Sequence, residues 1–400
     1  MNEFITTTIL ILAATLLIAA SNNDDMLDAY WDKPAATLGS APHQWSDLER
    51  NLSPESCAQC HVEKFDAWKN SLHAQAFSPG LIGQLAYIDL ESSNDCLACH
   101  APLAEQQFNT LQQIDAALLE KLKRPQGFDR NANPDTPKPE LRHAGVTCAV
   151  CHVRDWQRFG PSQRGTGKIG KVSGPAHNGF TGLKAFTTSQ FCASCHQFPQ
   201  EYAVNGKPLE NTLSEWQQSR FAREGVQCQS CHMPDRQHLF KGIHNPAMVR
   251  KGLRFTTNIS EQIATLSIAS VWIGHAFPTY AAPKVEVRIR AENAQGMVLQ
   301  EKKWNISRIV EYDDEQGWIE KSDTRLMPDE TRIFALSPLP EGVHKIDFLV
   351  EVMPDHFYKG IYRDLLAQDI QPDAGKLIQR ATHTANRNDY TLFQRSYSVR

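Results

Sequence analysis

The stretch Cys57-Ala-Gln-Cys60-His61 has the form Cys-x-x-Cys-His, and the same form returns at residues 96–100, 148–152, 192–196 and 228–232. The chain has 400 residues and 10 cysteines, and every cysteine belongs to one of these motifs. The spacing places two thiols on one side of a helical turn, with a histidine directly after the second. This pattern is typical of covalent haem attachment, in which the thiols bind the vinyl groups and the imidazole binds the iron. The sequence therefore predicts five haems of type c.

The motif residues have two expected roles. The cysteines would form the thioether bonds, and the histidines would be the proximal iron ligands. The cysteines are Cys57, Cys60, Cys96, Cys99, Cys148, Cys151, Cys192, Cys195, Cys228 and Cys231. The histidines are His61, His100, His152, His196 and His232. The first cysteines of successive motifs are 39, 52, 44 and 36 residues apart, which excludes a strict repeat and leaves too little chain for a domain around each haem. We expect the haems to share one core and to lie close together.

Three other uses of paired cysteines explain the pattern less well. A disulfide framework also needs an even number of cysteines, but it gives no reason for a histidine after every second one. Structural zinc would take the pairs two at a time, and five pairs is an odd number. A thioredoxin-like redox pair normally occurs once per domain, in a βαβ context.

A second axial ligand is expected at each iron, unless one position stays open for chemistry. His73 follows the first motif on a segment whose apolar residues recur at helical spacing. On a continuous helix it would lie about 18 Å along the axis from His61, so we expect it to bind a neighbouring haem. His143, just before the third motif, and His177, after a glycine-rich stretch, are further expected ligands.

The region after the fifth motif offers three more candidates. His238 and His244 are six residues apart and would face different directions on one helix, so one of them is an expected ligand, with His244 preferred and His238 kept open. His275, in Gly274-His-Ala-Phe-Pro-Thr279, is expected to reach a haem from the C-terminal part of the chain. Three of the remaining histidines are expected to be structural: His344, His356 and His383. The fourth, His43, is kept as a spare ligand.

The chain is expected to be an α+β multidomain protein. Residues 1–26 are predicted to be a signal peptide or a membrane anchor, because residues 4–20 are apolar, and the sequence leaves both open. Residues 27–255 should form a mainly helical, loop-rich pentahaem domain, with helices near 103–123 and 214–223. Residues 256–400 should form an antiparallel Ig-like β-sandwich with a C-terminal helix near 361–386 and a last strand near 390–393.

Charge and short motifs exclude two classes of partner. The 41 Lys and Arg residues are balanced by 45 Asp and Glu residues, without a basic stripe, so nucleic acid is not expected. Gly165-Thr-Gly-Lys-Ile-Gly170 has the letters of a dinucleotide fingerprint, but a predicted loop precedes it, so no nucleotide is expected.

The N-terminal half resembles the multihaem cytochromes related to the nitrifier tetrahaem cytochrome that takes electrons from hydroxylamine oxidoreductase. The resemblance lies in Trp68-Lys-Asn-Ser-Leu-His73, in Gly145-Val-Thr-Cys148 and in Cys228-Gln-Ser-Cys-His-Met-Pro234. The segment 274–279 with the following strands looks like the β domain appended to many exported bacterial multihaem cytochromes. The resemblance covers roughly residues 45–395 and implies a helical haem domain, mostly bis-histidine irons and electron transfer. The fifth motif and the appended β domain depart from the nitrifier pattern.

These features together predict an exported electron carrier rather than an enzyme. It would pass electrons between a membrane or periplasmic donor and an acceptor, through redox partner proteins. A periplasmic location, with or without a tether through residues 4–20, is expected, and the extracellular surface stays open. One alternative is a reductase or oxidase of a small nitrogen or sulfur species at a haem with an open site. A second is a structural subunit of a cytochrome complex or filament. The oligomeric state is left open.

Overall fold

The structure is a computed structural model that describes residues 27–32, 34–35, 40–124, 140–162, 171–172 and 179–399. The expected signal or anchor, the glycine-rich segment 165–170 and the expected ligand His177 lie outside the described residues. No helix among the described residues is long and apolar enough to span a membrane.

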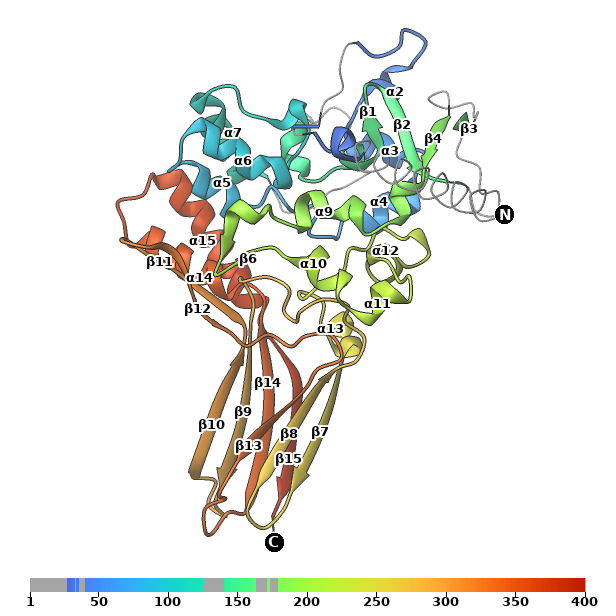
Figure 1. The fold of residues 1–400 in the computed structure, drawn as a ribbon. Helices are drawn as coiled ribbons and strands as arrows, with labels where there is room; N and C mark the ends of the chain where they lie inside the picture. Colours follow the sequence, from blue (N-terminus) through green and yellow to red (C-terminus); the bar gives the residue numbers. More distant parts are fainter. Residues whose placement is uncertain are drawn as a thin grey trace, which may run out of the picture. The chain divides into compact units, whose positions relative to one another are not determined.

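Two compact units share the chain, and each is described here by itself. Unit 1 comprises Met1–Phe77, Asp89–Leu111 and Gln126–Phe191. Unit 2 comprises Ser78–Ile88, Gln112–Pro125 and Cys192–Arg400. The first three motifs therefore lie in unit 1, whereas the fourth and fifth lie in unit 2 with the C-terminal strands (Figure 1). The expected boundary at 255/256 thus differs from the division by contacts, and it stays a prediction.

Unit 1 is built from short helices and turns. Its helices are α2 (Asp47–Arg50), α3 (Pro54–Ala58), α4 (Val62–Trp68), α6 (Leu90–His100) and α8 (Cys148–His152), with the 3-10 turns η1 (Ala104–Gln106), η2 (Leu141–Ala144) and η3 (Lys184–Thr187). A small sheet has the order β1-β2-β4-β3, from β1 (Val153–Arg154), β2 (Gln157–Pro161), β4 (Phe180–Leu183) and β3 (Lys171–Val172). Local signals set the helix starts: Ser53 caps α3, and Pro54 occupies its first turn, where no amide donor is needed.

Unit 2 contains two groups of helices besides its strands. Around the fourth and fifth motifs lie α10 (Thr212–Gln217), α11 (Arg220–Arg223), α12 (Cys228–His232), α13 (Pro246–Gly252), the turns η4 (Gln200–Tyr202) and η5 (Pro234–Arg236), and the hairpin β5 (Ala203–Val204) with β6 (Lys207–Pro208). The second group is α5 (Pro79–Leu85), α14 (His356–Leu366) and α15 (Pro372–Arg387). Gly80 and Gly83 let α5 pack closely on this pair, because a Cβ on Gly80 would lie 2.1 Å from the Tyr362 hydroxyl. Two further helices, α7 (Leu111–Lys123) and α9 (Gln190–His196), cross the division between the units.

Two antiparallel sheets form the C-terminal part of unit 2 (Figure 1). One has the order β10-β9-β14-β15, from β10 (Val298–Ile306), β9 (Lys284–Glu292), β14 (Lys345–Met353) and β15 (Tyr390–Ser398). The other has the order β13-β8-β7, from β13 (Thr331–Leu336), β8 (Ala264–Ser270) and β7 (Leu253–Ile259). Burial alternates strictly along β8, β9 and β14, and the inward residues of both sheets, such as Leu266, Val287 and Phe348, share one core.

The antiparallel strands and the last strand are confirmed, and a hairpin of β11 (Arg308–Asp313) and β12 (Gly317–Asp323) adds to them. The Ig-like topology stays a prediction.

The segments that were expected to be continuous helices are interrupted in the structure. The helix after the first motif ends at Trp68, so His73 is not on it, and the Ser71 hydroxyl accepts a bond from Ala74 N in the turn that follows. The segment 214–223 is two helices, because the Ser219 side chain caps a new one. The segment 103–123 is η1 and then α7. The segment 361–386 breaks before Pro372, which has no amide proton to continue a helix.

Candidate haem sites

All five motifs lie on or beside short helical turns. The third and fifth motifs coincide with α8 and α12, and the second and fourth end α6 and α9. The first runs from the end of α3 to His61, the residue before α4. None of the ten cysteines forms a disulfide. Each motif thus presents two thiols and an imidazole from about one turn of chain, which is the arrangement that covalent attachment requires.

Three motif histidines have their rings fixed by a backbone carbonyl. His100 Nδ1 lies 3.1 Å from Ala76 O, His152 Nδ1 lies 2.7 Å from Phe159 O, and His232 Nδ1 lies 2.7 Å from Lys241 O. A carbonyl oxygen only accepts, so Nδ1 carries the proton and Nε2 keeps the lone pair. This is how a protein orients a metal-binding histidine, and the motif residues therefore fit an iron porphyrin.

The fourth motif differs, because a carboxylate faces its histidine. His196 Nδ1 lies 3.9 Å from Glu210 Oε1, and Glu210 is held by the Thr212 hydroxyl at 2.5 Å. Burial disfavours the charged imidazole, but the Glu210 carboxylate outweighs it and raises the pKa of His196. A carboxylate behind a ligand histidine makes that ligand more basic than a carbonyl does.

His275 lies near the histidine of the fifth motif within unit 2. The rings of His232 and His275 are nearly parallel, at 16°, with centroids 6.3 Å apart. A metal–nitrogen bond of about 2 Å, with the ring centre roughly 1 Å beyond, places two trans imidazole centres about 6 Å apart. His275 Nδ1 is bonded to Ala276 O at 2.9 Å, so its Nε2 also keeps the lone pair. The ring separation and the tautomers of the pair would suit two histidines that hold one iron between them.

Burial keeps His275 neutral, as a metal ligand must be. Desolvation, reinforced by His232 and His196, lowers the pKa of His275 to about 4. Neutral imidazole is the form that binds metal, so this site needs no deprotonation at neutral pH. The electrostatic coupling also shows that the histidines of the fourth and fifth motifs lie near one another in unit 2.

The first and third motifs lie together in unit 1. The side chains of Cys57 and Cys148 hydrogen-bond to each other, which lowers the pKa of Cys57 and raises that of Cys148. Burial lowers the pKa of His152, and His61 is near enough to lower it further. Two sulfurs that would carry different haems are therefore neighbours in unit 1.

His73 and His143 are brought into one region of unit 1. Val146 N donates to His73 O at 2.9 Å, and His143 is buried with its ring edge-on to Phe77 at 5.1 Å. Gly145 allows this approach: its φ is +62°, and a Cβ there would lie 2.6 Å from His73 O. Ligation by these histidines stays a prediction.

The two histidines after the fifth motif have different surroundings. His238 Nδ1 faces Arg236 O at 3.2 Å. His244 Nε2 pairs with Asp355 Oδ1 at 2.9 Å, while its Nδ1 is buried without a hydrogen-bond partner. If His244 binds iron as predicted, the available donor atom is Nδ1, with Asp355 behind the ring.

Sequence reasoning missed three carboxylate and guanidinium groups near these histidines. Glu210 lies beside His196, and Glu215 with Arg325 holds the chain next to His275. Their positions relative to the motifs, 14 residues from His196 to Glu210 and 50 from His275 to Arg325, follow no local pattern. Only the fold brings them together.

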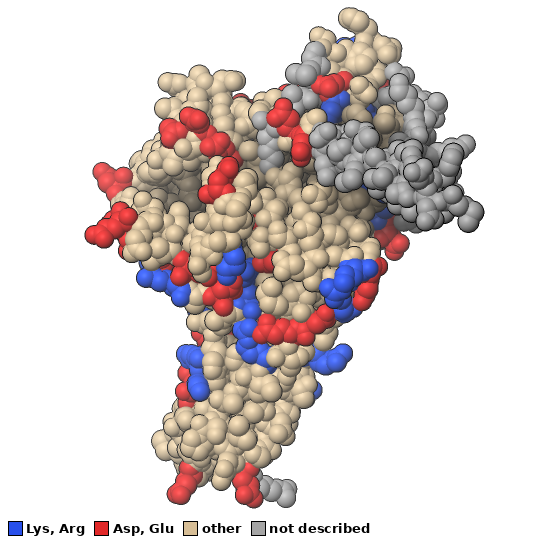
Figure 2. Space-filling view, viewed as in Figure 1, with Lys and Arg blue, Asp and Glu red and all other residues tan. Residues whose placement is uncertain are grey.

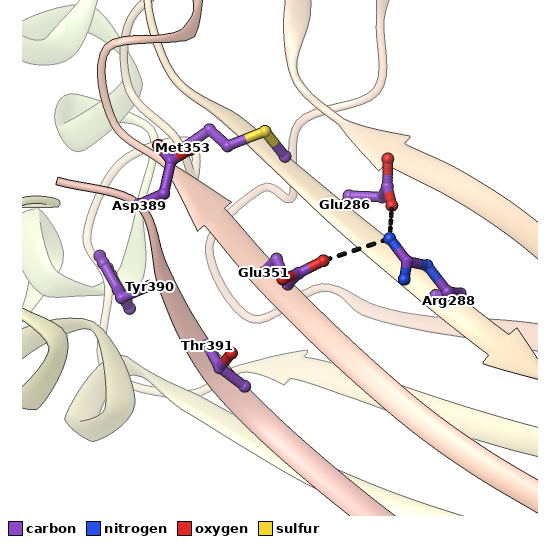
Figure 3. A pocket seen from close by; sticks show the side chains of 7 residues that line it. All are labelled: Glu286, Arg288, Glu351, Met353, Asp389, Tyr390 and Thr391. Atoms are coloured by element: carbon purple, nitrogen blue, oxygen red, sulfur yellow. Dashed lines mark hydrogen bonds and ion pairs between the residues drawn. The ribbon is translucent and has the colours of Figure 1, made fainter. Parts of the chain in front are cut away.

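A pocket on the C-terminal sheets is separate from the motif residues (Figure 3). It is lined by Glu286, Arg288, Glu351, Met353, Asp389, Tyr390 and Thr391. Arg288 lies between Glu286 at 2.6 Å and Glu351 at 3.2 Å, so its charge is already compensated. None of the lining residues is a motif residue or an expected ligand.

The described surface shows mixed charge. Figure 2 shows basic and acidic side chains beside one another on the face drawn. Examples with both signs in contact are Lys207 with Asp323 and Arg220 with Asp329. Such pairing is what the balanced composition predicts.

Known proteins resemble this chain in the region of its first two motifs and in its fold. Residues 56–122 match the family model described as cytochrome c554 and c-prime. No curated protein matches the chain. A penta-heme cytochrome c552 from Thermochromatium tepidum has 20% sequence identity and a TM-score of 0.58, covering 88% of this chain and 100% of its own. Two β-glucuronidase structures from Bacteroides uniformis, one of them a calcium-binding mutant, have 19% identity and a TM-score of 0.13. They cover 25% and 26% of this chain and 11% of their own, and carry no argument.

The similarity to the cytochrome c552 shows a shared fold. Together with the family match over the first two motifs, it supports a multihaem cytochrome of the c type with covalent haem.

Proposed function

We propose that this chain is an exported multihaem cytochrome that carries electrons through five covalently bound haems, between a membrane or periplasmic donor and a protein acceptor. When bound, the haems supply one-electron redox chemistry. The chain's own residues attach them, ligate the irons and exclude water from them. The proposal also includes a family relationship to the nitrifier tetrahaem cytochromes and an Ig-like arrangement of the C-terminal sheets.

One observation favours a carrier over an enzyme at the fifth motif. If His275 and His232 both held the iron of the fifth motif, as their 6.3 Å ring separation supports, no position on that iron would be open to a substrate. An iron with two protein ligands exchanges electrons but does not bind a small substrate. The contact between the first and third motifs, through Cys57 and Cys148, supports haems close enough to exchange electrons within unit 1.

Haem stoichiometry and ligand binding test the proposal. We expect the protein, produced in a host that matures c-type cytochromes, to show five haems per chain by intact mass and by haem-stained gel. The double variant Cys228→Ser with Cys231→Ser should lose one haem and keep four. The reduced wild type should bind no carbon monoxide at the fifth haem. A colourless product, or cysteines found as disulfides or bound to zinc, would overturn the proposal.

The same mass measurement locates the mature N-terminus. Cleavage near residue 20 would support a signal peptide, and retention of residues 4–20 would support a tether. Retention in the cytoplasm without haem would contradict export.

A further inference from the structure

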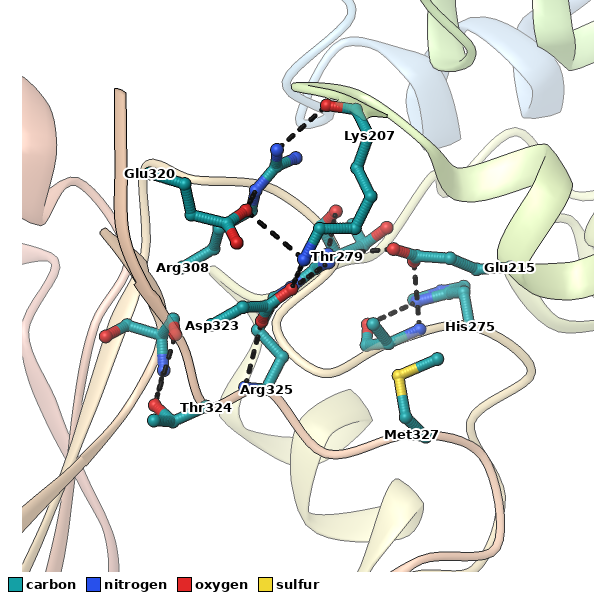
Figure 4. A network of polar contacts seen from close by, with 12 residues as sticks. Lys207, Glu215, His275, Thr279, Arg308, Glu320, Asp323, Thr324, Arg325 and Met327 are labelled. Carbon is teal, nitrogen blue, oxygen red and sulfur yellow. Dashed lines mark hydrogen bonds and ion pairs between the residues drawn. The ribbon is translucent and has the colours of Figure 1, made fainter. Parts of the chain in front are cut away.

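A buried ionic network lies beside His275 in unit 2 (Figure 4). Three basic side chains, Lys207, Arg308 and Arg325, are matched by Glu215, Glu320 and Asp323. Two pairs within it are the most deeply buried. The Arg325 and Glu215 side chains are 2% and 4% exposed, and those of Arg308 and Glu320 are 0% and 6% exposed.

The Glu215 carboxylate joins the network to the His275 loop. Its Oε1 accepts from Arg325 Nη1 at 2.9 Å, and its Oε2 accepts from Ala276 N at 3.0 Å. His275 Nδ1 is in turn hydrogen-bonded to Ala276 O at 2.9 Å. Ala276 therefore links the imidazole to the carboxylate, through its carbonyl on one side and its amide on the other. Glu215 comes from α10, between the fourth and fifth motifs.

Arg325 holds the other side of the same loop. It lies between β12 and β13, and it donates to Thr279 O at 3.1 Å and, through Nε and Nη2, to Asp323. The next residue, Leu326, exchanges two backbone hydrogen bonds with Phe277, at 2.7 and 2.9 Å. The loop 275–279 is therefore clamped from both sides by groups that do not touch the imidazole.

We propose that Glu215 and Arg325 are positioning residues that hold His275 against the iron of the fifth haem. The network gives the C-terminal strands a role in setting the coordination of that haem. The proposal rests on the proposed function, because it takes His275 as the ligand opposite His232. Loss of an outer partner of a metal ligand typically lowers metal affinity by about 10- to 100-fold.

Three holoprotein variants test the proposal by absorption and EPR spectroscopy. His275→Ala is the reference and should leave one haem high-spin and able to bind carbon monoxide when reduced. Glu215→Gln keeps the shape of the side chain but cannot satisfy both Ala276 N and Arg325. We expect it to populate the same high-spin haem, with added imidazole restoring the low-spin spectrum. Arg325→Lys, which reaches fewer acceptors, should give the same result if Glu215→Gln does not mature.

Glu320→Gln is the matched control. It removes a carboxylate of the same network that pairs with Arg308 at 2.7 Å but has no described bond to the loop 275–279. We expect it to lower thermal stability while all haems keep the wild-type spin state.

Each other outcome has a definite meaning. If His275→Ala shows a high-spin haem and Glu215→Gln does not, the positioning role is wrong and the ligand assignment stands. If Glu320→Gln behaves as Glu215→Gln does, the network is a general fold element, which also overturns the proposal. If His275→Ala leaves every haem low-spin, His275 is not the ligand and the assignment fails together with the inference.

Discussion

Gly145 offers a direct test of how unit 1 brings its predicted ligands together. The residue is buried and has φ +62° and ψ −134°, a region that only glycine adopts readily. An added Cβ would meet His73 O at 2.6 Å and Ala76 N at 3.0 Å, both backbone atoms that cannot rotate away. Gly145→Ala should therefore cost about 1–3 kcal/mol in backbone strain and about 1 kcal/mol for the weakened Val146 N to His73 O bond. The sum is roughly 2–4 kcal/mol.

The measurement is the free energy of unfolding from denaturant titration of the holoprotein, followed by far-UV circular dichroism. Gly160→Ala is the control in the same unit, because Gly160 has no left-handed backbone and its nearest neighbour is the edge of the Phe180 ring at 3.3 Å, which can shift. We expect a change under about 1 kcal/mol there. Equal losses for the two variants would refute the reasoning that Gly145 permits a close backbone crossing.

Three further predictions concern individual ligands and their partners. His73→Ala should turn one haem high-spin without detaching it, and an unchanged spectrum would discard that ligand. His244→Ala should do the same if Nδ1 binds iron, and Asp355→Ala should do so in part, because it removes the partner behind that ring. Equal destabilisation of both variants with all haems low-spin would show that the pair at 2.9 Å is only structural. Glu210→Gln should make His196 a weaker electron donor to its iron and so raise the reduction potential of one haem, measured by spectroelectrochemical titration. A tenfold change in the redox equilibrium corresponds to about 59 mV. An unshifted potential would show that Glu210 does not have this role.

The haem chemistry could be predicted from sequence because it is local. Two thiols and an imidazole within five residues meet on one helical turn whatever the surroundings, so α8 and α12 coincide with their motifs. The strands were equally predictable, since β9 and β14 alternate buried and exposed residues with the period of a half-buried sheet. Both signals need only neighbours along the chain.

The prediction of continuous helices was wrong, because apolar spacing does not show where a helix ends. Apolar spacing suggested one helix through His73 and another through residues 361–386, but α4 ends at Trp68 and α14 at Leu366. The Ser71 hydroxyl accepts a backbone bond in the turn after Trp68, and Pro372 starts α15 instead of continuing α14. Capping and proline effects outweigh periodicity at these points, and the distance from His61 estimated for a continuous helix does not apply to His73.

The division of the chain by contacts differs from the boundary predicted at 255/256, because the change from helices to strands near residue 253 is not where contacts separate. His275 lies beyond that change yet faces His232, and Arg325 and Glu215 meet although 110 residues separate them. A domain boundary drawn at the first strand would separate His275 and Arg325 from His232 and Glu215. If the fifth haem depends on these contacts, its coordination requires the C-terminal strands to be folded. The coordination of that haem then reports the folding of the C-terminal strands.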